Sequence, residues 1–227
     1  HKVDEAKAFI AQTGAPIVVK ADGLAAGKGV VVAMTIDEAN VAVEDMLSGN
    51  RFGDAGSTVV IEEFMEGEEA SLLAFVDGKT VVPMIASQDH KRIFDGDKGP
   101  NTGGMGTYAP APVLTDALRD AAMKTILEPM VAAVEKEGMP YVGCLYAGLM
   151  ITDEGPKVVE FNARFGDPET QVVLPLLDSD LGEIMMACAK GTLTSNMVKW
   201  KDSSAACVIL ASKGYPETSS KGDVISG

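Results

Sequence analysis

The sequence predicts an α+β protein with two lobes, and two patterns support this prediction. The first third of the chain alternates short apolar runs with amphipathic helical stretches, whereas the middle contains apolar runs joined by a tight-turn signal. The 227 residues suffice for one large domain or two small lobes, and a hydrophobic content of 46% permits a substantial core. We expect α+β lobes at residues 1–66 and 67–195, with 196–227 starting a further, truncated carboxy-terminal lobe.

An initial helix and a strand–loop–strand–helix segment are expected in the first lobe. The helix at 3–13 has its apolar residues on one face and is closed by Gly14. A second helix ends at Leu47 and begins at a capping box, because Thr35 and Glu38 have the required spacing. The strands are short and apolar, and are expected at residues 17–20, 30–33 and 58–64.

The second lobe is predicted around a hairpin, for which Asp77-Gly78 is the turn signal. Residues 62–69 are expected to connect the two lobes. Residues 87–112 lack a hydrophobic period and are predicted to be a long functional loop. A helix over 115–138 is expected to kink at Pro129. The remaining elements, in chain order, are strands at 71–76, 80–85, 144–152 and 157–162, a helix at 180–190 and a buried strand at 205–211.

Composition excludes several classes of partner. With 19 basic and 33 acidic residues the net charge is −14, which argues against general affinity for nucleic acid or anionic membranes. The sequence contains neither an apolar run long enough to span a membrane nor a secretory signal. Cys144, Cys188 and Cys207 lie in apolar surroundings, which predicts reduced core thiols of a cytoplasmic protein and no nucleophile. The absence of an initiator Met at the start predicts an internal fragment.

Residues 158–169 are the most informative stretch, because they form an apolar strand with polar groups on one face. Side chains alternate along a strand, so Glu160, Asn162 and Arg164 are expected on one face, and Val159 with the intervening residues on the other. A carboxylate and an amide oxygen suit Mg²⁺, and the guanidinium can grip a phosphoryl or carboxylate oxygen. The alternative is a strand end whose charged residues form a local ion pair.

A second pattern is a small-residue loop between two strands at residues 18–30. Its glycines let backbone N–H groups approach phosphate oxygens, and Lys20 and Lys28 supply positive charge. The loop is not a Walker loop, because Lys28 is followed by Gly29 and the loop leads into a strand. It predicts a hairpin flap over phosphates. The alternative is a flexible hairpin with surface lysines.

Two further segments have weaker signals. Backbone groups of residues 62–65 could pair with an adenine edge, and Glu69 could accept hydrogen bonds from ribose hydroxyls, although acidic runs are usually solvated faces. Residues 88–92 combine charges of both signs, and residues 99–106 are rich in glycine, which allows close backbone contact with a ligand. His90 by itself would more often be structural than catalytic.

Four segments together resemble the ATP-grasp ligases, and in detail the glycinamide ribonucleotide synthetase family: residues 20–29, 89–92, 99–106 and 162–169. The resemblance implies an ATP-grasp fold, with the nucleotide between two α+β lobes. It also implies an ADP-forming ligase of purine biosynthesis that uses ATP with Mg²⁺ or Mn²⁺. Glycine would be activated as glycyl phosphate and joined to 5-phosphoribosylamine to give glycinamide ribonucleotide.

The resemblance also implies roles for matching residues. Lys20 and Arg164 are expected to be catalytic, and Glu160 and Asn162 to bind the metal. ATP binding is expected for Lys20, Lys28, Glu62, Glu63, Phe64, Met65 and Glu69. Substrate binding is expected for Asp89, His90, Lys91, Arg92, Asn101, Thr102, Gly103, Gly104 and Asp167.

Several points stay open at the level of sequence. Residues 147–150 offer no acidic ligand, which leaves binding of a second metal open. Relatives have an amino-terminal domain and an upstream phosphate-binding lysine, so the 227 residues are expected to bind nucleotide weakly and turn over poorly. The competing functions are another ATP-grasp carboxylate–amine ligase or carboxylase, or a non-catalytic nucleotide-binding module. Oligomeric state is not predicted.

Overall fold

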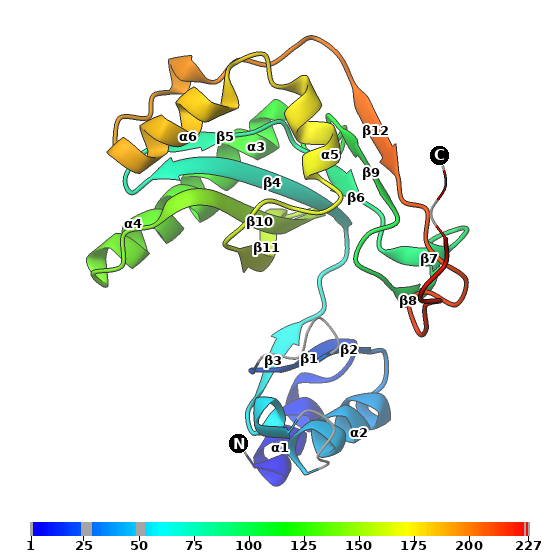
Figure 1. The fold of residues 1–227 in the computed structure, drawn as a ribbon. Coiled ribbons are helices and arrows are strands. Elements are labelled where there is room, and N and C mark those ends of the chain that lie inside the picture. The colour runs from blue at the N-terminus through cyan, green and yellow to red at the C-terminus, as the bar shows by residue number, and fades with distance from the viewer. Residues whose placement is uncertain (1, 24–28, 49–52, 225, 227) are drawn as a thin grey trace. The chain divides into compact units, whose positions relative to one another are not determined.

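Three antiparallel strands and two helices form the first of two units, residues 1–65. The computed structural model describes residues 2–23, 29–48, 53–224 and 226 (Figure 1). The sheet has the order β2-β1-β3. Its strands are β1 (Ile17–Ala21), β2 (Val30–Ala33) and β3 (Val59–Glu63), the helices are α1 (Val3–Thr13) and α2 (Ile36–Leu47), and a 3₁₀ turn spans Gly53–Gly56.

Two local sequence signals of this unit, the capping box and the glycine that ends the first helix, are confirmed. Thr35 accepts a hydrogen bond from the Glu38 backbone N–H and the Glu38 side chain accepts from the Thr35 N–H, which completes the predicted capping box. Gly14 ends α1 with a φ of 89°, in the region that favours glycine. One face of the sheet packs against both helices in a core that contains Ile10 and Val43. The other face is left without a helix among the described residues of this unit.

The second unit, residues 66–227, is built on a four-stranded antiparallel sheet of order β11-β10-β4-β5. The strands are β4 (Glu68–Asp77), β5 (Val81–Pro83), β10 (Val142–Thr152) and β11 (Gly155–Asn162). The hairpin at Asp77-Gly78 is confirmed, because β4 and β5 pair directly across it. The predicted connection over 62–69 was wrong at its end, because Glu68 and Glu69 pair with β10 as the first residues of β4.

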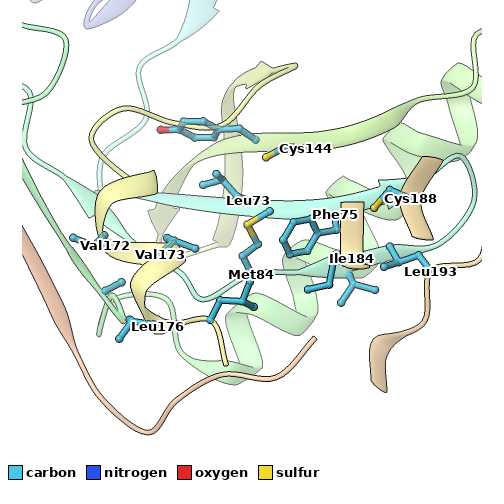
Figure 2. Packing of buried hydrophobic residues seen from close by; sticks show 14 residues of the cluster. Leu73, Phe75, Met84, Cys144, Val172, Val173, Leu176, Ile184, Cys188 and Leu193 are labelled. Atoms are coloured by element: carbon cyan, nitrogen blue, oxygen red, sulfur yellow. The ribbon is translucent and has the colours of Figure 1, made fainter. Parts of the chain in front are cut away.

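Helices cover both faces of this sheet (Figure 1). On one face Leu73, Phe75 and Tyr146 pack against α5 (Thr170–Val173) and α6 (Leu181–Lys190), together with a 3₁₀ turn at Leu174–Leu176. Figure 2 shows this core with Phe75, Met84 and Ile184 side by side. On the other face Leu72, Ala147 and Leu149 pack against α3 (Asp116–Ala122) and the π-helical turn Met123–Leu127, which α4 (Glu128–Lys136) follows. Alternation along β4 and β10 thus buries both faces.

The break expected in the helix at 115–138 is a π-helical turn at Met123–Leu127, between α3 and α4. Thr115 caps the start of α3 by accepting from the Leu118 N–H. Pro129 lies in the first turn of α4, where its missing N–H costs least. The proline therefore follows the irregular turn.

Residues 87–112 were expected to be a long functional loop, and the expectation of a loop was wrong, because the segment contains four short strands. They are β6 (Gln88–Asp89), β7 (Arg92–Phe94), β8 (Lys98–Asn101) and β9 (Gly106–Ala109). β7 pairs with β8, and β9 lies between β6 and the late strand β12 (Ala205–Val208). Strands of two to four residues are too short to show a period, so their partners decide them.

The strand expected at 205–211 is confirmed over its first half, and β12 pairs with β9 within the second unit. The expectation that this strand is buried was wrong, because Val208 is 77% exposed. A 3₁₀ turn at Ser195–Met197 precedes it. The assignment of 196–227 to a further lobe stays a prediction.

Cys144 and Cys188 are buried free thiols, as expected, and Cys207 is half-buried. Burial, together with Cys188, raises the pKa of Cys144 to about 12, so this thiol is a poor nucleophile. Within the described part of the chain, no helix has the length and apolarity needed to cross a bilayer.

Candidate functional site

The strand register of the second unit brings polar residues of three strands into rows on one sheet face. Gly148 of β10 is paired with Ser71 of β4 on one side and with Glu160 of β11 on the other. In the next row, Tyr146 is paired with Asn162. A Cβ on Gly148 would lie 3.3 Å from Cγ of Glu160, so glycine leaves room above the middle strand. The result is a small pocket lined by Glu69, Ser71, Asp89, Lys91, Tyr146, Gly148, Val159 and Glu160.

A bulge alters the predicted alternation along β11. The register shifts between Gly148 and Leu149, which pair with Glu160 and Val158, so Val159 is the extra residue. Val159 was expected on the opposite face, and this expectation was wrong because the bulged side chain lines the same pocket as Glu160. Phe161 does pack into the core on the other face, as expected.

The predicted metal ligands lie side by side. Asn162 Nδ2 donates to Glu160 Oε1 at 3.2 Å, and Glu160 is exposed. This bond uses the amide nitrogen and one carboxylate oxygen, so the amide oxygen and the second carboxylate oxygen are not consumed by it. Among the described residues, no group of three His, Cys, Asp or Glu side chains could hold a metal. A carboxylate oxygen and an amide oxygen side by side are ligands of the type that Mg²⁺ takes, since this cation binds a few protein oxygens and completes its shell with water or phosphate.

The buried carboxylate of Glu169 accepts hydrogen bonds from two residues that line the pocket. Glu169 is 2% exposed, and its Oε1 accepts from the Tyr146 hydroxyl at 2.6 Å and from the Ser71 hydroxyl at 3.1 Å. Its Oε2 has no hydrogen-bond partner among the described residues. A Cβ on Gly166 would come within 2.3 Å of Oε2, so glycine is required beside it. Three segments distant in sequence thus meet at one carboxylate.

Asp89 contributes a second carboxylate with unusual surroundings. Burial, and then the nearby charge of Glu169, raise the pKa of Asp89 to about 7, although Lys91 opposes the shift. Its Oδ1 is buried and has no hydrogen-bond partner in the described parts of the chain. The group is therefore poised to exchange a proton, or to accept a donor from a ligand, near neutral pH.

Lys91 is the cation of this pocket. Its Nζ lies 2.7 Å from Oε2 of Glu69. Burial alone would lower the pKa of Lys91, but Glu69, Glu160 and Asp89 outweigh burial and raise the pKa. The structure therefore pairs Glu69, which was expected to bind the ribose of ATP, with Lys91, which was expected to bind the other substrates.

The glycine-rich loop lies beside these charges. The backbone N–H and the hydroxyl of Thr102 both donate to the Lys91 carbonyl oxygen, at 2.7 and 2.8 Å. The Thr102 oxygen in turn accepts from the Gly104 N–H at 3.0 Å. Gly104 has a φ of 126°, and a Cβ there would lie 2.8 Å from Oδ1 of Asp89. The predicted residues Asp89, Lys91, Thr102, Gly103 and Gly104 therefore belong to one neighbourhood.

Other predicted residues lie around it or point elsewhere. Arg92 pairs with Asn101 across the β7–β8 hairpin and donates to the Gly99 carbonyl. The His90 ring packs against Tyr108 at a centroid distance of 5.5 Å, which favours the structural interpretation. Exposed Asp167 accepts from the Gln171 side chain at 2.6 Å.

Arg164 lies two residues beyond the end of β11, so it does not extend the strand face. It is exposed and donates to the Phe165 carbonyl at 2.8 Å. Among the described residues the guanidinium forms no ion pair with a carboxylate, so a ligand could bind it by replacing the bond to the Phe165 carbonyl.

In the first unit, the predicted nucleotide residues Lys20 and Glu62 share the sheet face on which no helix lies among the described residues. Lys20 is paired with Val30 and Val60, and Val18 with Val32 and Glu62. Lys20 forms an ion pair with Glu62. Val30, Val32 and Val60 are exposed on this face, beside the Lys20–Glu62 ion pair. An exposed apolar face of this kind could pack against a flat aromatic group.

Three further residues that were predicted to bind ATP lie at the end of β3 or directly after it. Glu63 ends this strand, and Phe64 and Met65 follow it outside any helix or strand. Lys28 and residues 24–27 lie outside the described residues.

Sequence reasoning assigned no role to Ser71, Tyr146, Glu169 or Tyr215. Ser71 and Tyr146 lie within predicted strands, where their apolar neighbours suggested packing only. Glu169 stands in the signature stretch, and its buried contacts depend on residues 23 and 98 positions earlier. No local signal could have revealed these contacts.

Comparisons with known proteins agree with this architecture. Residues 1–170 match the family described as phosphoribosylglycinamide synthetase, ATP-grasp (A) domain. Phosphoribosylamine–glycine ligases of Xanthomonas campestris and Neisseria meningitidis are 57% and 56% identical across the whole chain, which covers 53% and 54% of their lengths. The crystal structure of the Thermotoga maritima ligase superposes with a TM-score of 0.88 at 35% identity, over 97% of this chain and 56% of that one.

The fold and the site together define an ATP-grasp domain. The chain belongs to the phosphoribosylglycinamide synthetase ATP-grasp domain family, by the match over residues 1–170. It spans about half the length of the curated relatives that it matches.

Proposed function

We propose that this chain is the nucleotide- and substrate-binding part of a phosphoribosylamine–glycine ligase. The observation that carries the proposal is 57% identity over all 227 residues to a relative of that name. The ligase would join glycine to 5-phosphoribosylamine with conversion of ATP to ADP and phosphate. Its carboxylate substrate must be activated first, because a carboxylate is a poor electrophile, and phosphorylation by ATP gives glycyl phosphate.

Within this proposal, residues of the chain bind and orient the reactants. Lys20 would neutralise phosphate oxygens of ATP, and the apolar face around it would receive the base. Glu63, Phe64 and Met65 would present backbone groups to the adenine edge. Arg164 would stabilise the phosphoryl group during transfer and the acyl phosphate that results.

The pocket of the second unit would hold the other reactants. Asp89, Lys91 and the loop 102–104 offer a carboxylate, an ammonium group and backbone N–H groups within one neighbourhood. A carboxyl whose pKa is about 7 can accept a proton from an attacking amine, so we assign this role to Asp89. Positioning of the amine against the acyl phosphate would supply much of the remaining rate.

Glu160 and Asn162 would hold the divalent metal. The fit rests on two oxygen ligands, a carboxylate oxygen of Glu160 and the amide oxygen of Asn162, whose side chains lie next to each other on one face of β11. A bound Mg²⁺ or Mn²⁺ supplies charge neutralisation and orientation of phosphate oxygens.

The test is ADP release by the full-length natural protein with MgATP, glycine and phosphoribosylamine. ADP release should require both substrates. Release that depends on a different acid or amine would instead indicate another ATP-grasp ligase or carboxylase.

The variant Arg164→Ala separates a ligase from a nucleotide-binding module. We expect kcat to fall on the order of 100-fold or more, with ATP affinity retained. A protein that binds ATP but shows no turnover in its natural form would contradict the proposal. Lys157→Ala, at the exposed Glu154 ion pair, is the control for loss of a positive charge.

We also propose that the protein is located in the cytoplasm. The buried free thiols Cys144 and Cys188 support a reducing compartment such as the cytoplasm.

A further inference from the structure

The segment that follows β12 is attached to the glycine-rich loop of the pocket. The Ile209 N–H donates to the Met105 carbonyl at 2.9 Å, which extends the pairing of β12 with β9. Six residues later, the Tyr215 hydroxyl accepts a hydrogen bond from the Gly103 N–H at 3.0 Å. Two contacts therefore join residues 209–215 to the loop 103–105.

The tyrosine is held by a turn of its own. The Tyr215 N–H donates to the Ser212 carbonyl at 3.2 Å, and the Thr218 N–H donates to the Gly214 carbonyl at 2.9 Å. Gly214 has a φ of 93°, a conformation that other residues rarely adopt. Tyr215 itself is half-buried. Its hydroxyl is thus presented by a defined turn.

The other side of the loop belongs to the pocket. Gly104, the next residue, bonds to Thr102 and through it to the Lys91 carbonyl. The backbone of Gly104 also lies against the Asp89 carboxylate, since a Cβ there would lie 2.8 Å from Oδ1. The Gly103 N–H therefore lies between the Tyr215 hydroxyl and the residues to which we assign substrate binding.

We propose that Tyr215 is a positioning residue, whose hydroxyl fixes the 102–104 loop against Asp89 and Lys91. This inference rests on the proposed function, because the loop matters only if it binds substrate. Gly103 is exposed, so without the hydroxyl its N–H would bond to water instead, and the loop would lose one of its two contacts with residues 209–215. Loss of the hydroxyl should then weaken binding of the substrates at this loop and leave ATP binding unchanged.

The experiment compares Tyr215→Phe with the natural full-length protein, measuring kcat and KM for glycine, phosphoribosylamine and ATP. We expect KM for glycine or phosphoribosylamine to rise about fivefold, the usual worth of one hydrogen bond, with KM for ATP within twofold. Amide hydrogen exchange at Gly103 should become faster. Tyr141→Phe is the control, because its hydroxyl donates to the Cys144 carbonyl at 2.6 Å, outside the pocket.

The outcomes separate this inference from the proposed function. If the natural protein is active and Tyr215→Phe matches it in every KM, the inference is wrong. Equal rises in all three KM values, or the same change in Tyr141→Phe, would show a general structural effect and also overturn it. Absence of ligase activity in the natural protein would refute the proposed function instead.

Discussion

At the scale of single residues, the surroundings of two aspartates shift their pKa values in opposite directions. Burial tends to raise the pKa of Asp77, but backbone N–H groups of Thr80, Lys79 and Leu193 outweigh burial and lower it. Burial also raises the pKa of Asp89, and there Glu169 adds to the shift. One aspartate is therefore a structural acceptor, and the other is a titrating group in a pocket.

The first prediction concerns Asp89→Asn. In the folded chain Asp89 has a pKa of about 7, above its ordinary 3.8, so the folded state binds more protons than the unfolded state between these values. The stability of the natural chain should therefore fall as pH rises from 4 to 7 through this group. Asp89→Asn should lack this contribution, so its stability relative to the natural chain should increase with pH and level off above about 7.

Urea unfolding from pH 5 to 8 in metal-free buffer tests this prediction. Trp200, the single tryptophan, packs against the core of the second unit and reports its unfolding. Asp95→Asn, in the exposed β7–β8 turn, is the control. An identical pH dependence in Asp89→Asn and the natural chain would contradict the assignment.

At the scale of elements, the β4–β5 turn shows how a local signal gains a long-range role. Asp77 Oδ1 accepts from the Lys79 and Thr80 N–H groups at 3.1 and 2.7 Å, which closes the predicted hairpin. Its Oδ2 accepts from the Leu193 N–H at 3.0 Å, just beyond α6. The turn therefore also anchors the end of a helix that follows more than a hundred residues later.

The second prediction is that Asp77→Asn destabilises the second unit by about 2 kcal/mol, because an amide cannot accept at both positions. The folded pKa of Asp77 is lowered, so its contribution is fully present above the unfolded value of 3.8 and is lost as pH falls through the folded pKa. The difference between variant and natural chain should shrink in acid. Urea unfolding at pH 7 and pH 3 measures both values.

Asp153→Asn, in the exposed turn between β10 and β11, is the matched control for Asp77→Asn. Equal stability of the two variants at pH 7 would show that the bond to Leu193 contributes nothing.

At the scale of the whole molecule, ligand binding should couple to stability, since a ligand that binds only the folded chain stabilises it. The third prediction is that ADP with Mg²⁺, at about 100 times its dissociation constant, stabilises the protein by about 2.7 kcal/mol. EDTA should remove the part that depends on metal. Thermal unfolding of the full-length protein with ADP, with and without EDTA, measures this.

Glu160→Gln should lose the metal-dependent stabilisation and keep the part that ADP gives without metal. Glu154→Gln, in the same β10–β11 hairpin but ion-paired to Lys157, should behave like the natural protein. A full metal response in Glu160→Gln would place the metal elsewhere.

The sequence by itself determined the elements whose signals are local. The capping box at Thr35, the hairpin at Asp77 and the acid–amide pair on β11 depend on spacings of two to four residues, and all three are present in the structure. The motif order also led to the family, because glycine and charge patterns are carried by short segments.

Tertiary structure alone decided the rest. The pairing of β6 with β9 and the Ser71, Tyr146 and Tyr215 contacts are set by partners 18 to 112 residues away. The β7–β8 hairpin and the Val159 bulge join strands that are closer in sequence, but their short or irregular pairing shows no period. Hydrogen bonds of this kind form when packing brings the groups together, and they leave no periodic trace in the chain. For this reason the residues to which we assign substrate and metal binding could be proposed from the sequence, whereas the residues that contact the pocket or its loop, such as Glu169 and Tyr215, could not.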